Sequence, residues 1–84
     1  MLYYLIVCRS LTYAQRTAAA LERTGIFART LRSPKSVSSE GCSHCVRIAR
    51  KDLEMALTVL HHAGLRPKRV FAAQSDGSYT EMPL

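Results

Sequence analysis

Two cysteines separated by two residues form the densest chemical feature of this chain, in the segment Cys42-Ser43-His44-Cys45. Redox dithiols and metal sites share this Cys-x-x-Cys spacing, so the spacing alone leaves both kinds of site open. A cysteine reacts as its thiolate, which is stabilised by a nearby cation or by the free amides of a helix N-terminus. We therefore expect Arg9, Ser10 and Lys35 to stabilise an anion formed on the motif.

The third cysteine, Cys8, ends an apolar run. Because free cysteine is among the most buried residue types, the favoured interpretation is a small buried hydrophobe. The alternative is that Cys8, Cys42, Cys45 and His44 form a four-ligand zinc site, or that the two motif cysteines alone hold Cu(I). The position of His44 in a predicted strand favours a hydrogen-bonded or solvent-facing histidine over a ligand or an acid/base group.

The first half of the chain predicts a strand, a helix and a second strand. Residues 2–8 are apolar throughout, which is typical of a central strand buried on both faces. Ser10 or Thr12 can cap the following helix, which Gly25 ends. Residues 26–32 alternate as a half-exposed edge strand does.

The second half repeats this pattern after a loop. Residues 33–41 are rich in serine and predict a loop that leads into a strand near 44–48. Because Cys42 and Cys45 flank this loop, we expect both thiols to be accessible. Asp52 lies in the first turn of a second helix that ends at Gly64, and its closing residues His61 and His62 suit the negative end of the helix dipole. Residues 69–73 predict the last strand.

Two consecutive βαβ halves predict an α+β, ferredoxin-like βαββαβ domain with a four-stranded antiparallel sheet and two helices on one face. In that arrangement the first and third strands are antiparallel neighbours. Cys8 should therefore approach Cys42 and Cys45, and the second helix should bring His61 and His62 towards the same end. The sheet face without helices should be apolar and exposed, which predicts a homodimer, or else a C-terminal tail folded back over it.

Length and composition set the remaining bounds. With 84 residues the chain has room for one core, so we expect a single domain over 1–73 and a loose polar tail over 74–84. The net charge is +6, but the arginines are scattered, so nucleic-acid binding is disfavoured. The sequence shows no signal-peptide pattern and no apolar run of about 20 residues, so we expect a soluble cytoplasmic protein whose three cysteines stay reduced.

Several short segments together carry a family resemblance. They are Tyr4-Leu5-Ile6-Val7 before the turn Arg9-Ser10, the helix exit from Leu21 to Gly25-Ile26, Pro34 followed by Val37-Ser38-Ser39 and Cys42, the strand Val46-Arg47-Ile48, and Asp52-Leu53-Glu54-Met55-Ala56-Leu57 leading to Gly64-Leu65. On these segments the chain resembles the selenium/sulfur carrier protein-like family, a small bacterial domain formerly of unknown function. It differs in having Ser43 after the cysteine and a second thiol at Cys45.

The resemblance implies a non-enzymatic carrier that holds sulfur or selenium on Cys42, as a persulfide or selenosulfide, between donor and acceptor proteins. Cys45 would assist, either by releasing the cargo or by closing a disulfide. A zinc or copper module is the first alternative, and a protein- or RNA-binding module without thiol chemistry is the second. No carboxylate pair, phosphate loop or Ser-His-Asp arrangement is legible, so a conventional enzyme is the least favoured class.

Overall fold

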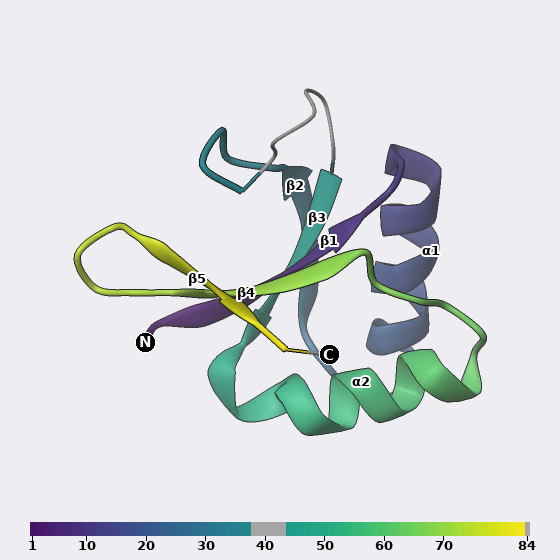
Figure 1. The fold of residues 1–84 in the computed structure, drawn as a ribbon. Coiled ribbons are helices and arrows are strands. Elements are labelled where there is room, and N and C mark those ends of the chain that lie inside the picture. Colours follow the sequence, from purple (N-terminus) through teal and green to yellow (C-terminus); the bar gives the residue numbers. More distant parts are fainter. Residues whose placement is uncertain (38–43, 84) are drawn as a thin grey trace.

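A computed structural model describes residues 1–37 and 44–83 of the chain. Two α-helices, five strands and a short 3-10 helix follow one another along the chain (Figure 1). In order they are β1 (Tyr3–Cys8), α1 (Leu11–Glu22), β2 (Ala28–Arg32), β3 (His44–Ala49), η1 (Arg50–Asp52), α2 (Leu53–His62), β4 (Arg69–Ala73) and β5 (Tyr79–Met82). Among the described residues, no helix is long and apolar enough to span a membrane.

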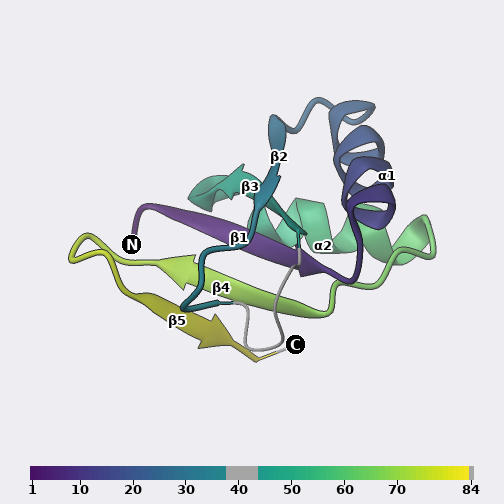
Figure 2. The same ribbon diagram turned by 90° about the horizontal axis from the view of Figure 1, so that it is seen from above.

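The strands form one antiparallel sheet in the order β2-β3-β1-β4-β5. Both helices pack on the same side of it, as the two views of the ribbon show (Figures 1 and 2). The predicted α+β class, the antiparallel sheet and the pairing of the first and third strands are confirmed. The predicted count of four strands is wrong, because a fifth strand pairs with β4.

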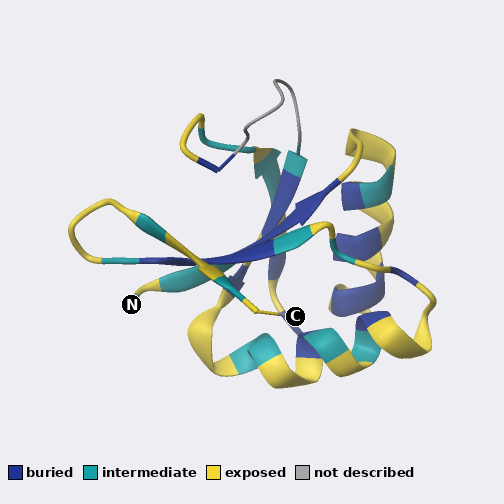
Figure 3. Ribbon diagram, viewed as in Figure 1, coloured by how far each residue is buried: buried dark blue, intermediate teal, exposed yellow. Residues whose placement is uncertain are grey.

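Strand β1 lies in the middle of the sheet, between β3 and β4. Its residues Leu5 to Cys8 are all buried, and Figure 3 colours the buried parts of the central strands dark blue. Side chains of a strand alternate between its two faces, so burial of four consecutive residues requires cover on both sides of the sheet. The continuous apolar run 2–8 predicts this central position correctly.

On the helix side of the sheet, β1 contributes Ile6 and Cys8 to the main core, and the helices contribute Leu21 and Leu60. On the other side, here called the open face, a second and smaller cluster is buried. It consists of Leu5, Val7, Val37, Cys45 and Phe71. Val37 belongs to the segment that follows β2 and crosses the sheet on the side away from the helices (Figure 2).

This second cluster corrects the expectation of an exposed apolar face. Leu5, Val7 and Phe71 are 0%, 3% and 7% exposed within a single chain, and Val37 covers them at 3% exposure. Val37, from the segment after β2, lies in this cluster, and Tyr79, from the C-terminal strand β5, packs against it. The C-terminal residues, predicted as an alternative cover, thus contribute part of it, and no second copy is needed to bury these residues. The homodimer therefore stays a prediction, but an exposed apolar sheet face no longer supports it.

The C-terminal residues, expected to be a loose tail, form a hairpin with β4. Gly77 has a φ of +87°, a conformation that favours glycine, and the Gln74 N–H donates to the Ser78 carbonyl across the turn. The Asp76 carboxylate accepts from both the backbone N–H and the hydroxyl of Ser78 at 2.9 and 2.6 Å. The expectation of a loose tail is therefore wrong, because the turn brings Tyr79–Met82 back alongside β4.

Helix α1 starts directly after β1, and its start is fixed by Ser10. The Ser10 Oγ accepts a hydrogen bond from the Tyr13 N–H at 3.1 Å, so Ser10 rather than Thr12 is the N-cap. We expect Ser10→Ala to lower the free energy of unfolding by about 1 kcal/mol, because a first-turn amide loses its partner. Urea unfolding measures this loss, and Thr12→Ala is the matched control that should leave stability nearly unchanged. Equal losses in both variants would contradict the assignment of the cap.

Candidate functional site

The end of β1 and the start of β3 bring two of the three cysteines to one edge of the sheet. In the register of these strands, Val7 pairs with Cys45 and Cys8 pairs with His44. The predicted approach of Cys8 to the motif is therefore confirmed for Cys45 at the level of the backbone. Cys42 lies outside the described residues.

The two thiols nevertheless lie on opposite faces of the sheet. Paired residues of antiparallel strands share a face, and neighbouring residues of one strand do not. Cys45 thus shares the open face with Val7, whereas Cys8 shares the helix side with His44. Both cysteines are free thiols with 0% exposure.

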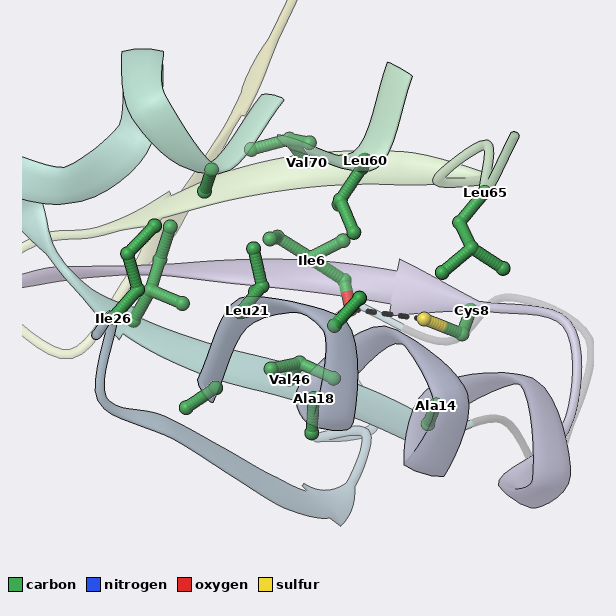
Figure 4. Packing of buried hydrophobic residues seen from close by; sticks show 14 residues of the cluster. Ile6, Cys8, Ala14, Ala18, Leu21, Ile26, Val46, Leu60, Leu65 and Val70 are labelled. Atoms are coloured by element: carbon green, nitrogen blue, oxygen red, sulfur yellow. Dashed lines mark hydrogen bonds between the residues drawn. The ribbon is translucent and has the colours of Figure 1, made fainter. Parts of the chain in front are cut away.

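Cys8 is part of the main core, as the favoured sequence interpretation predicts. It belongs to the same buried cluster as Ile6 and Ala14 (Figure 4), and its Sγ is 3.7 Å from the Ile6 carbonyl oxygen and 3.8 Å from the Thr17 hydroxyl. Burial raises the pKa of the Cys8 thiol to about 11, against which the Thr17 contact has a smaller, lowering effect. At neutral pH this group is therefore a protonated packing residue.

Cys45 is buried in the second cluster, which corrects the expectation that it is accessible. Burial raises the pKa of its thiol, and the neighbouring Ser33 hydroxyl lowers that pKa by a smaller amount. The Ser33 Oγ is buried and, in the described part of the chain, has no hydrogen-bond partner of good geometry. We therefore regard the contact between Ser33 and Cys45 as weak, and Cys45 as a poor nucleophile in this conformation.

Two of the four proposed zinc ligands, Cys8 and Cys45, lie on opposite faces of the sheet, and a third, Cys42, is outside the described residues. A zinc ion holds its sulfur ligands at about 2.3 Å, so thiols on opposite faces of one sheet cannot share it. Cys8 and Cys45 are such a pair, although His44, half-buried, lies on the same side as Cys8. Within residues 1–37 and 44–83, no group of three metal-binding side chains occurs.

The residues expected to stabilise an anion, Arg9, Ser10 and Lys35, make no contact with a thiol group in the described part of the chain. The Arg9 guanidinium stacks over the Tyr13 ring at 4.4 Å, Ser10 caps α1, and Lys35 is exposed in the turn that ends at Val37. None of these contacts involves Cys8 or Cys45. Their predicted role at Cys42 stays a prediction.

The remaining histidines follow the simpler interpretation. His61 and His62 are exposed in the last turn of α2, where a cation is favoured by the helix dipole, and their rings contact each other at 5.9 Å. The exit of α2 does lie near the start of α1, because the Arg66 N–H donates to the Tyr13 hydroxyl at 2.6 Å.

Sequence reasoning missed Thr17 and Val37, the residues that set the surroundings of the two thiols. Thr17 is a buried polar residue one turn after Ala14. It lies on the same helix face as Ala14, Ala18 and Leu21, so their helical spacing could have predicted its burial. Val37 is the one β-branched aliphatic residue in a serine-rich loop, and that contrast in composition was a usable signal.

Comparison with known proteins identifies a family whose sequence pattern this chain matches. The model of a family described as "Putative Se/S carrier protein-like" matches residues 3–72, which run from the start of β1 to the last but one residue of β4 and include Cys42. No curated protein and no solved structure gives a significant match to the chain.

The raised pKa of Cys8 predicts a loss of stability in alkali. The thiol has a pKa of 9.0 in the unfolded chain and about 11 in the fold, so between these values the unfolded chain releases the proton first and is favoured. Stability should fall by about 2–3 kcal/mol as pH rises through this window. Urea unfolding of wild type and Cys8→Ala from pH 8 to 11 isolates the effect, since the variant lacks this contribution. Parallel curves for the two proteins would refute it.

Burial of both thiols predicts that neither reacts in the folded protein. In a Cys42→Ser variant, a chromogenic disulfide reagent at pH 8 should label Cys8 and Cys45 slowly in the fold and rapidly in urea, because about one Cys8 thiol in a thousand is ionised at that pH. Rapid labelling of the folded variant would mean that the cover provided by Val37 opens readily.

Proposed function

The chain belongs to the Se/S carrier protein-like family, and we propose that it holds a sulfur or selenium atom on Cys42 and passes it between a donor and an acceptor protein. The observation that supports this choice of cysteine is the burial of the other two. Cys8 and Cys45 are fully buried and their pKa values are raised, so neither suits attack on a donor. A thiol carrier also fits the cytoplasm, where thiols stay reduced.

Loading requires no external oxidant. The Cys42 thiolate attacks the terminal sulfur of a donor persulfide, R–S–SH, and the bond between the two donor sulfurs breaks. Cys42 becomes a persulfide and the donor leaves as the thiolate R–S⁻. A selenium atom in the terminal position follows the same exchange and leaves Cys42 as a selenosulfide.

Unloading can take two routes, which differ in the use of Cys45. An acceptor thiolate attacks the outer atom of the Cys42 persulfide, forms the acceptor persulfide and returns Cys42 to its thiolate. Alternatively, the Cys45 thiolate attacks the inner sulfur, which closes a Cys42–Cys45 disulfide and releases HS⁻. The second route requires the buried Cys45 thiol, whose pKa is raised, to ionise, and it requires a thiol reductant to reopen the disulfide.

Cysteine variants and native mass spectrometry test the proposal. After exposure to a low-molecular-weight persulfide, Cys45→Ala should gain the mass of one carried atom, and Cys42→Ser should gain none. Wild type and Cys8→Ala should gain the same mass on the first route of unloading, and on the second route they should lose two hydrogens as Cys45 closes the disulfide. Treatment with a reducing thiol should remove the adduct. Undiminished loading of Cys42→Ser would contradict the proposal, as would a metal adduct in untreated protein together with no loading.

The fate of Cys45→Ala separates the two routes of unloading. If acceptor thiols unload the carrier directly, this variant transfers its cargo to a test thiol at the wild-type rate. If Cys45 resolves the persulfide, wild type accumulates an internal disulfide and releases sulfide, whereas Cys45→Ala keeps its cargo. A circular dichroism spectrum equal to that of wild type establishes that the variant is folded.

A further inference from the structure

Two arginines lie directly opposite each other on the open face. Arg29 of β2 pairs with Arg47 of β3, and both side chains are exposed. Like charges at paired positions of neighbouring strands destabilise a sheet. In the described part of the chain neither arginine has an ion pair with a carboxylate, whereas Arg69 is paired with Glu81 at 4.0 Å. Among residues 1–37 and 44–83, no carboxylate thus neutralises these two adjacent positive charges.

Aromatic side chains adjoin this pair of charges. The Arg47 guanidinium carbon is 4.0 Å from the centre of the Tyr3 ring, and the Tyr3 hydroxyl is 3.5 Å from the Tyr79 hydroxyl. A guanidinium stacked on a ring is held in place and keeps its charge. Arg47 is therefore a pre-positioned cation beside the unrestrained Arg29.

Tyr3, Arg29 and Arg47 border a cavity of about 330 Å³ at one end of the sheet. Its lining includes Leu2, Tyr3, Phe27, Arg29, Arg47 and Ala49. Phe27 is 75% exposed and Leu2 57% exposed, so two large apolar side chains are open to water at the same place. This volume lies at the lower end of the range for small-molecule sites, which combine apolar walls with a few polar groups.

We propose that this cavity binds a small anion in which a phosphate is joined to a flat aromatic ring, as in a nucleoside monophosphate. Arg29 and Arg47 pair with the phosphate, because guanidinium groups match phosphate oxygens in two-point hydrogen bonds. The ring covers the exposed Phe27. Binding neutralises the charge repulsion between the strands and buries an apolar side chain in one step.

This site lies at the opposite end of β1 from Cys8, and the binding proposal does not depend on the proposed function. Tyr3 begins β1 at the cavity, and Cys8 ends the same strand where β3 starts. Five residues of strand separate them by about 17 Å. Failure of sulfur loading would therefore leave the ligand proposal standing, and failure of ligand binding would leave the carrier proposal standing.

Calorimetric titration with adenosine monophosphate tests the proposal on the full chain. Arg29→Gln should weaken binding about tenfold or more. Arg16→Gln is the matched control, because it removes the same charge from an exposed position on α1, away from the open face, and should change affinity less than about twofold. Absence of binding to wild type, or equal losses in both variants, would overturn the proposal.

Fragments of the ligand test its two parts. Adenosine and inorganic phosphate should each bind at least about tenfold more weakly than the nucleotide, since each lacks one half of the contacts. Phe27→Ala should weaken nucleotide binding, whereas Met55→Ala, which truncates an exposed side chain on α2, should not. Phosphate binding as tight as the nucleotide would overturn the role of the ring. Binding of a single-stranded RNA oligonucleotide without binding of the mononucleotide would overturn the small-ligand assignment.

Thermal unfolding without ligand supplies a readout that is independent of binding. Arg29→Gln should raise the melting temperature by about 1–5 °C, because it removes the repulsion across the strand pair, and Arg16→Gln should not. Weaker binding combined with higher stability cannot result from a damaged fold. A lower melting temperature for Arg29→Gln would show that Arg29 has a structural partner and would overturn the proposal.

Discussion

The alternation of side chains along β1 and β3 is the constraint on which the rest of this structure depends. Strand β1 is paired at both edges and covered on both faces, so each of its side chains is committed to one of two clusters. Cys8 and Cys45 lie on paired strands but one position out of register, and this offset alone separates their thiols by the sheet. A site that uses both thiols would require a shift of the register, which would turn every buried side chain of a strand to the other face.

Those features of the fold that depend on local pattern could be predicted from the sequence. The apolar run of β1 indicated a central strand, and the helix stops at Gly25 and Gly64 indicated two helices of the right length, since both glycines adopt positive φ. β5 was missed because its sequence, Tyr-Thr-Glu-Met, is too polar to resemble a buried strand. The dipeptide Asp76-Gly77 before β5 is typical of a hairpin turn, and it indicated a following strand more strongly than the polar composition of β5 argued against one.

The surroundings of the thiols could not be predicted to the same extent. The depth of Cys45 depends on Val37, eight residues earlier in a loop whose path across the open face is a tertiary contact without a local pattern. The order of the strands was enough to predict that Cys8 lies near β3. The prediction that the two thiols lie on opposite faces would have required the pairing register of β1 and β3, and an error of one residue in a strand boundary changes that register. Sequence reasoning thus located the right edge of the sheet and misjudged the accessibility of one of its thiols.

The open face is divided along the strands into two ends of different character. Towards the end of β1 the row Leu31, Cys45 and Val7 is sealed by Val37, and its chemistry is suppressed by burial. One row towards the start of β1, Arg29 and Arg47 lie side by side next to Tyr3, and both side chains are exposed. Selection for stability alone could remove this repulsion by a single substitution, since a glutamate at either position would form a cross-strand ion pair with the remaining arginine. The retained repulsion is the kind of local conflict that marks a functional surface, because natural sequences break the rules of stability chiefly where binding requires it.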